Sequence, residues 1–66
     1  MIERSYEEVP DERLRVGDCV EVIGLWARIV QIKRYEGPIE FVMGVAILDR
    51  GNAFSLCRGQ FTKRKK

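Results

Sequence analysis

The sequence predicts an all-β domain in which five short strands bend into a small barrel. Apolar and polar residues alternate over several short segments, as is typical of half-buried strands. Glycine-containing turn sequences separate these segments. A flat sheet of this size would leave one apolar face bare, so we expect the strands to curve around a shared core.

Length and composition indicate one domain near the lower size limit for independent folding. The chain has 66 residues, of which 45% are hydrophobic, a formal net charge of +2 and no histidine. Its cysteines, Cys19 and Cys57, are interpreted as strand residues rather than metal ligands. No apolar segment approaches the roughly 20 residues that span a bilayer. We therefore expect a cytoplasmic protein in a reducing compartment, without a metal, a cofactor or a membrane contact.

The first 13 residues are expected to form an irregular acidic arm. They are polar, show no sustained period and are interrupted by Pro10, which suits the first position of a single helical turn. The barrel is expected over residues 14–62, and residues 63–66 are expected to form a basic tail.

The first two strands of the barrel are predicted to form a hairpin around the sequence VEVIGLWARIV. Gly24-Leu25 fits a two-residue type II′ turn, which needs glycine first. The resulting register places Val20 opposite Ile29, with apolar pairs on the core face. Ile29 and Ile32 cannot both point inward along a regular strand, so a bulge or a strong bend is expected near Val30 or Gln31.

The next two strands are predicted to form a hairpin across the sequence ILDRGNAFSL, with Arg50-Gly51 as the loop. This register places Ile47 opposite Phe54. It also places Val45 opposite Leu56, and both pairs are expected in the core.

Two further sequence features predict local structure near this hairpin. Gly44 predicts a kink or a close approach of two backbones. The sequence RGQF predicts a short 3₁₀ turn, which leads into the last strand, FTKRK.

The segments VGDCVEV, ARIVQI, GVAILDRGNAFSL and GQFTK, in this order, resemble the SH3-like small barrels, in particular the Tudor and KOW groups. The resemblance covers residues 15–64 and implies a five-stranded SH3-like barrel. Tudor domains bind methylated side chains, and KOW motifs bind RNA or ribosomal and transcription partners.

The Tudor hairpin is often Asp-Tyr-Gly-Asn, in which the Tyr helps to build an aromatic cage. Here Asp49, Gly51 and Asn52 match, but Arg50 stands at the Tyr position. A guanidinium there repels a methylated cation, so the likeness supports the fold and argues against that ligand. A KOW motif normally has a longer loop between its first two strands, so its binding residues do not carry over to this chain.

Catalysis has little support in the sequence. No histidine is present, and neither cysteine has a base near it in the sequence. The carboxylate pairs Glu7-Glu8 and Asp11-Glu12 lie in the expected arm, outside any burying environment. We expect a binding module and not an enzyme, without a small-molecule substrate.

Nucleic acid, either RNA or DNA, or a nucleoprotein machine of the transcription or translation type, is the first expected partner. Residues 1–12 hold five acidic residues and one basic residue, whereas residues 50–66 hold six basic residues and no acidic one. Such asymmetry favours a polyanionic partner. The alternative is an acidic head that folds back on a solubilising tail. The candidate phosphate-binding residues are Arg50, Arg58, Lys63, Arg64, Lys65 and Lys66. An exposed Trp26 or Tyr35 is expected to stack on a base.

A protein partner or a homodimer is the alternative function that the sequence leaves open. On the expected register, Ile23 and Trp26 share the outer face with the Glu21–Arg28 pair. Exposed aromatic anchors are enriched at protein interfaces, whereas a core position for Trp26 fits the sequence equally well. The candidate partner-binding residues are Ile23, Trp26, Arg28 and Tyr35.

Overall fold

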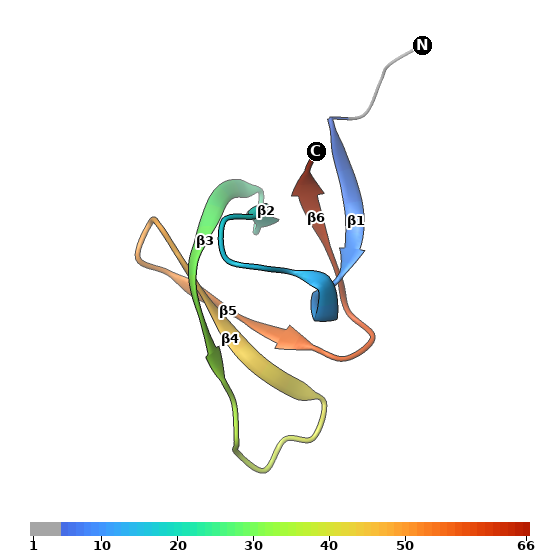
Figure 1. Ribbon diagram of the computed structural model, residues 1–66, viewed down its shortest axis with the longest axis vertical. Coiled ribbons are helices and arrows are strands. Elements are labelled where there is room, and N and C mark those ends of the chain that lie inside the picture. Colours follow the sequence, from blue (N-terminus) through green and yellow to red (C-terminus); the bar gives the residue numbers. More distant parts are fainter. Residues whose placement is uncertain (1–4) are drawn as a thin grey trace.

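A computed structural model describes residues 5–66 and shows an all-antiparallel β fold. Six strands and one short 3₁₀ helix make up this part of the chain: β1 Tyr6–Pro10, η1 Asp11–Arg13, β2 Cys19–Val22, β3 Leu25–Arg34, β4 Val42–Leu48, β5 Ala53–Cys57 and β6 Phe61–Lys65. They form one sheet in the order β1-β6-β2-β3-β4-β5, which curls without closing (Figure 1). The expected barrel of five strands is thus corrected to an open sheet of six.

The additional strand is β1, which lies where the sequence predicts an irregular arm. It runs antiparallel to β6, with Glu7 opposite Arg64 and Val9 opposite Thr62. Val9 and Thr62 are both buried, so this segment contributes to the interior. The acidic segment therefore folds back on the basic one, as the alternative interpretation of the charge asymmetry expects. Residues 1–4 of the acidic segment lie outside the described residues.

The β2–β3 hairpin turns one residue earlier than the sequence predicts. Its turn residues are Ile23 and Gly24, with φ angles of 52° and 76°, as a type I′ turn requires. Val20 therefore lies opposite Ala27 and not opposite Ile29. The pairing moves by two residues, so the inward faces are unchanged, and all three of these side chains are buried.

The long strand β3 joins the two halves of the sheet. Its first part pairs with β2 and its second part with β4. The register shifts between Ile29 and Gln31, which confirms the bulge expected near Val30. In β4, a Cβ on Gly44 would lie 2.7 Å from the carbonyl oxygen of Lys33, so the close backbone approach is also confirmed.

The β4–β5 hairpin has a different register from the predicted one. The N–H of Leu48 donates to the Asn52 carbonyl at 2.8 Å, which leaves Asp49-Arg50-Gly51 as the loop. Ile47 lies opposite Ala53 rather than opposite Phe54. In this loop Gly51 has a φ of 90°, which glycine adopts at little cost. An odd number of loop residues moves the pairing by one position.

This shift exchanges the two faces of β4, because side chains alternate along a strand. The predicted core residues Val45 and Ile47 are only half-buried, and Ala46 and Leu48 fill the interior instead. Leu56 is buried as predicted, although Val45 is not its partner. The buried hydrophobic residues of the described chain are Val9, Leu14, Val20, Ala27, Ile29, Ala46, Leu48 and Leu56.

The helical turn expected after Pro10 is confirmed as η1, and it positions Asp11 inside the fold. Asp11 is 2% exposed. Its carboxylate accepts hydrogen bonds from the Cys57 backbone N–H at 3.0 Å, from Gln60 Nε2 at 2.7 Å and from the Thr62 hydroxyl at 2.7 Å. Asp11 therefore ties the N-terminal segment to β5 and to β6.

The connection from β5 to β6 is a tight turn and not the predicted 3₁₀ turn. The N–H of Gln60 donates to the carbonyl of Cys57 at 3.3 Å, and Gly59 has a φ of 77°. In the described part of the chain, the 3₁₀ conformation is found at η1 instead.

Candidate nucleic-acid interface

Strand alternation divides the predicted basic tail between the two faces of β6. Thr62 is buried, so Arg64 shares the inner face with it. Lys63 and Lys65 lie on the outer face of the same strand. Lys66 follows the strand, and its side chain is exposed. Three of the four residues of the expected basic tail therefore belong to β6 and are divided between its two faces.

Two aromatic rings accompany the outer lysines. The ring centroids of Tyr6 in β1 and Trp26 in β3 lie 6.2 Å apart, with the planes tilted by 47°. The Nζ atom of Lys63 lies 5.0 Å from the centre of the Tyr6 ring, and that of Lys65 lies 5.3 Å from the Trp26 ring. Both distances fall within the roughly 6 Å range of cation–π contacts. We call these four residues the aromatic-basic face.

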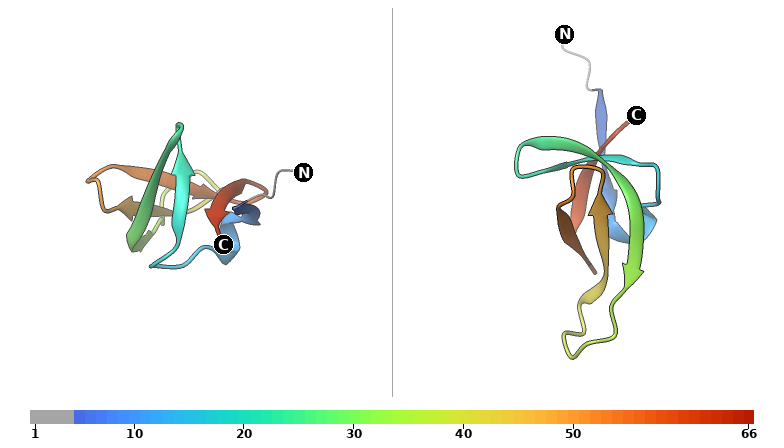
Figure 2. Two further views of the ribbon diagram at one scale, coloured as in Figure 1. Left: turned by 90° about the horizontal axis from the view of Figure 1, so that it is seen from above. Right: turned by 90° about the vertical axis from the view of Figure 1, so that its left-hand side faces the viewer.

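The strand order brings these four side chains together. The strands β1, β6, β2 and β3 are neighbours in the sheet, and Figure 2 shows them beside one another from above. Tyr6 lies opposite Lys65, and Trp26 lies opposite Glu21 rather than opposite Ile23 as predicted. Trp26 is half-buried on the outer face, so it is not a core residue.

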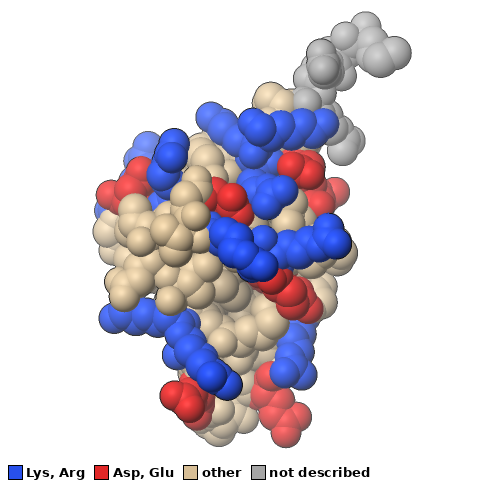
Figure 3. Space-filling model, viewed as in Figure 1, with Lys and Arg blue, Asp and Glu red and all other residues tan. Residues whose placement is uncertain are grey.

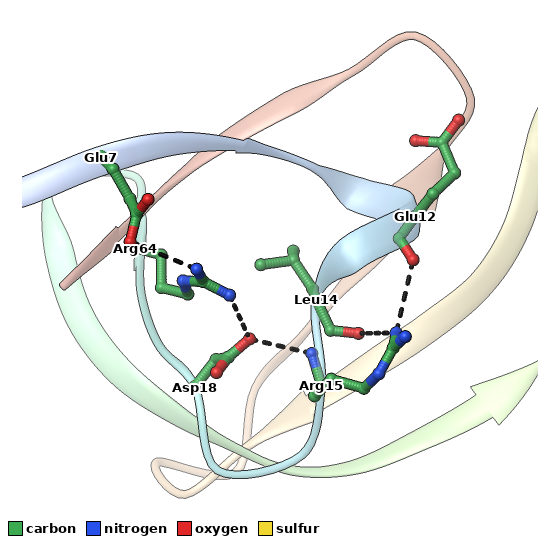
Figure 4. Close-up of polar contacts among 6 residues, drawn as sticks. All are labelled: Glu7, Glu12, Leu14, Arg15, Asp18 and Arg64. Carbon is green, nitrogen blue, oxygen red and sulfur yellow. Dashed lines mark hydrogen bonds and ion pairs between the residues drawn. The ribbon is translucent and has the colours of Figure 1, made fainter. Parts of the chain in front are cut away.

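Arg64 is engaged within the fold (Figure 4). Its guanidinium donates to the carboxylate of Glu7 at 3.2 Å and to that of Asp18 at 3.4 Å. The hydrogen bond to Glu7, reinforced by Asp18, raises the pKa of Arg64 above its ordinary value. Asp18 also accepts a hydrogen bond from the Arg15 backbone N–H at 2.9 Å. Arg64 thus connects β1, β6 and the loop before β2, and these contacts compete with binding to a phosphate.

The structure does not bring Arg50 and Arg58 to this face. Arg50 lies in the β4–β5 loop and Arg58 in the turn after β5, so the two lie at opposite ends of β5 (Figure 1). The backbone N–H of Arg58 donates to the Phe41 carbonyl at 2.8 Å, next to the β3–β4 loop. Of the predicted phosphate-binding residues, Lys63 and Lys65 are those in contact with the aromatic rings.

The predicted partner-binding residues are also separated from one another. Ile23 lies at the tip of the β2–β3 hairpin and is 96% exposed. Arg28 is exposed, and its backbone N–H donates to the carboxylate of Asp49 at 3.2 Å. Tyr35 follows the end of β3 that is far from Trp26, so these two rings do not form one aromatic cage.

Tyr6 is the residue of the aromatic-basic face that sequence analysis missed. It lies in the segment interpreted as an arm, where apolar and polar residues do not alternate as they do in a half-buried strand. The signal that was present is weaker: Tyr favours strands, and Pro10 suits the end of an edge strand.

Acidic side chains are interspersed with the basic ones at this end of the molecule. Figure 3 shows basic side chains gathered where β1 and β6 lie, with acidic side chains among them. Two acids share the outer face by register, because Glu8 lies opposite Lys63 and Glu21 lies opposite Trp26. They reduce the positive charge that a polyanion would meet.

Cys19 and Cys57 are free thiols in β2 and β5, which confirms that they are strand residues. Within residues 5–66, no group of three His, Cys, Asp or Glu side chains is placed to hold a metal ion. Over the same residues, no helix is long and apolar enough to cross a membrane. The chain matches no protein-family model, no curated protein and no solved structure. Its function is therefore inferred from its own geometry.

Proposed function

We propose that this protein is a non-catalytic module that binds single-stranded nucleic acid through the aromatic-basic face. The contact of Lys65 with the Trp26 ring, beside that of Lys63 with the Tyr6 ring, carries this proposal. Proteins that bind single strands combine basic residues, which follow the phosphates, with aromatic rings, on which bases stack.

Binding exchanges one set of contacts for another. In the free protein each ammonium group lies over a ring. An incoming base takes the place of the ammonium group over the ring, and the lysine moves to a neighbouring phosphate. Stacking contributes about 1–3 kcal/mol per base and needs an unpaired base, so a single strand is favoured over a duplex.

The direct test is an anisotropy titration of a fluorescein-labelled oligothymidylate of about ten nucleotides, a length within the usual site size for a small β-barrel. We expect binding that weakens as salt rises. For Lys63→Gln/Lys65→Gln, the slope of log K against log salt should fall by about 1.4, because two phosphate contacts of a single strand are lost. Substitution is preferable to deletion of residues 63–66, since most of these residues belong to β6.

The matched control is Arg13→Gln/Arg58→Gln, which removes the same charge from exposed positions outside the aromatic-basic face. This control should keep the salt slope of the unmodified chain. Equal losses in the two double variants would show that binding follows net charge alone and would contradict the proposed site.

Glu21 supplies a test in the opposite direction. It lies opposite Trp26, where its carboxylate repels an approaching phosphate. We expect Glu21→Gln to bind the same oligothymidylate about threefold more tightly, since a surface charge interaction contributes at most about 1 kcal/mol. An unchanged or weaker affinity would place the nucleic acid elsewhere on the molecule.

A further inference from the structure

An apolar groove lies beside the second half of β3 and shares no residue with the aromatic-basic face. It has a volume of ≈ 360 Å³ and is bounded by residues 11–15 and by β3 and β4. Its floor is apolar: Leu14 and Leu56 are buried, and Ile32 and Met43 are partly exposed where they pack against the core. Such a floor binds apolar side chains rather than phosphates.

The rim of this groove is basic. Arg15, Lys33 and Arg34 all line it, and all three are exposed. None of the three forms an ion pair with another residue of the described range 5–66. The Nη1 atom of Arg15 donates to the carbonyls of Glu12 at 3.4 Å and Leu14 at 3.3 Å, which positions its guanidinium at the rim (Figure 4). Glu12 is the exposed acid of the lining.

The β3–β4 loop, residues 35–41, carries the complementary pattern. Ile39 is 46% exposed and Phe41 is 59% exposed. Glu36 and Glu40 lie beside them, and both are exposed. Figure 3 shows acidic side chains at the end of the molecule formed by this loop and basic side chains above it. The loop therefore offers apolar side chains flanked by carboxylates.

Hydrogen bonds constrain this loop. The hydroxyl of Tyr35 accepts a hydrogen bond from the Ile39 N–H at 3.4 Å. The carbonyl of Phe41 accepts one from the Arg58 N–H at 2.8 Å. Since the loop is already ordered, it loses little conformational entropy when it docks.

We propose that this groove binds the β3–β4 loop of a second copy of the chain, so that the protein forms a two-fold dimer. The loop connects the two strands that line the groove. A two-fold axis beside this end of the molecule would bring each loop to the groove of the other copy, in an isologous interface. Apolar side chains then meet the apolar floor, and carboxylates meet the basic rim. The dimer does not depend on the proposed nucleic-acid binding.

Sedimentation equilibrium of the full chain over a range of concentrations tests this proposal. We expect a limiting mass of about twice the 7.7 kDa of one chain. Phe41→Ser should weaken dimerisation at least about tenfold, because it removes the aromatic anchor. Phe61→Ser is the matched control, since Phe61 is also 59% exposed but lies in β6, and it should leave the dimer intact.

Charge reversal gives a second, independent measurement. Arg34→Glu alone and Glu40→Arg alone should each weaken the dimer, whereas a mixture of the two variants should form a heterodimer. A monomer at every concentration overturns the proposal. A dimer that Phe41→Ser leaves intact overturns it as well, because another surface would then hold the two copies together.

Discussion

At the scale of single residues, the buried carboxylate of Asp11 connects segments that are distant in the sequence. It accepts three hydrogen bonds, from Cys57, Gln60 and Thr62, and is almost completely enclosed. These donors belong to segments more than forty residues away in the sequence, so one side chain joins the N-terminal segment to the end of β5, the β5–β6 turn and β6. Removing the carboxylate leaves all three donors without this acceptor.

We expect Asp11→Ala to lower the free energy of unfolding by about 3 kcal/mol, because three donors lose a buried acceptor and the side chain leaves a cavity. The measurement is the urea midpoint. Glu12→Ala is the control, because Glu12 is the exposed neighbour, and its change should stay within about 0.5 kcal/mol. Equal midpoints for the two variants would refute the role given to Asp11.

Ile23 is the one non-glycine residue with a positive φ within residues 5–66. It has a φ of 52° and is 96% exposed, and a β-branched side chain at such an angle is strained. Asn tolerates this conformation and is favoured in type I′ turns. We therefore expect Ile23→Asn to raise the thermal midpoint, with a gain of about 1 kcal/mol in the free energy of unfolding. Ile23→Val keeps the branch and should show no gain; a gain of equal size there would argue against relief of strain.

At the scale of elements, β1 distinguishes the structure from the barrel that the sequence predicts. Its Val9 is 4% exposed and lies opposite the buried Thr62 of β6. We expect Val9→Ala to cost about 2 kcal/mol of stability, as a truncation inside a core does. In the same strand, Glu8→Ala removes an exposed side chain and should cost much less. If Val9→Ala were as stable as Glu8→Ala, residues 6–10 would be the irregular arm after all.

Strand positions were predictable from the sequence, whereas pairing partners were only partly so. Local alternation located β2, β3, β4 and β5, and the conflict between Ile29 and Ile32 located the bulge in β3. The registers of both hairpins were wrong, because each depends on which residues occupy the turn. The β1–β6 pairing was missed, because it joins the two ends of the described chain and no local pattern encodes it.

The candidate site was likewise predictable in its individual residues but not in how they are brought together. Trp26, Lys63 and Lys65 were each singled out from the sequence: the lysines for nucleic acid, and Trp26 for base stacking, for a protein partner or for the core. The strand order β1-β6-β2-β3 places all three on one face and adds Tyr6. Arg64 was also predicted to bind phosphate, but the alternation of side chains along β6 places it on the inner face, where it pairs with Glu7 and Asp18. The strand pairings decide which side chains share a face, and the sequence does not reveal these pairings.

At the scale of the whole molecule, the two proposed surfaces lie on different parts of the sheet. The aromatic-basic face belongs to β1, β6 and β3, whereas the groove is bounded by residues 11–15 and by β3 and β4. A dimer formed through the grooves would leave both aromatic-basic faces open. We expect an oligothymidylate long enough to reach both faces to bind at least about tenfold more tightly than a short one, through effective concentration.

Phe41→Ser should abolish this gain and leave the affinity for the short strand unchanged. The comparison is an anisotropy titration of both lengths on both proteins. If the long strand keeps its advantage in the Phe41→Ser variant, the gain comes from additional contacts on one copy rather than from the dimer.

The most direct test of nucleic-acid binding uses the single tryptophan of the chain, Trp26, as the reporter. A base that stacks on this ring quenches its fluorescence, and competing salt restores the emission as the phosphate contacts are lost. We predict saturable quenching when oligothymidylate is added to the unmodified protein, and much weaker quenching in Lys63→Gln/Lys65→Gln at the same concentrations. Unchanged Trp26 emission at oligonucleotide concentrations that saturate binding by anisotropy would contradict the aromatic-basic face as the binding site.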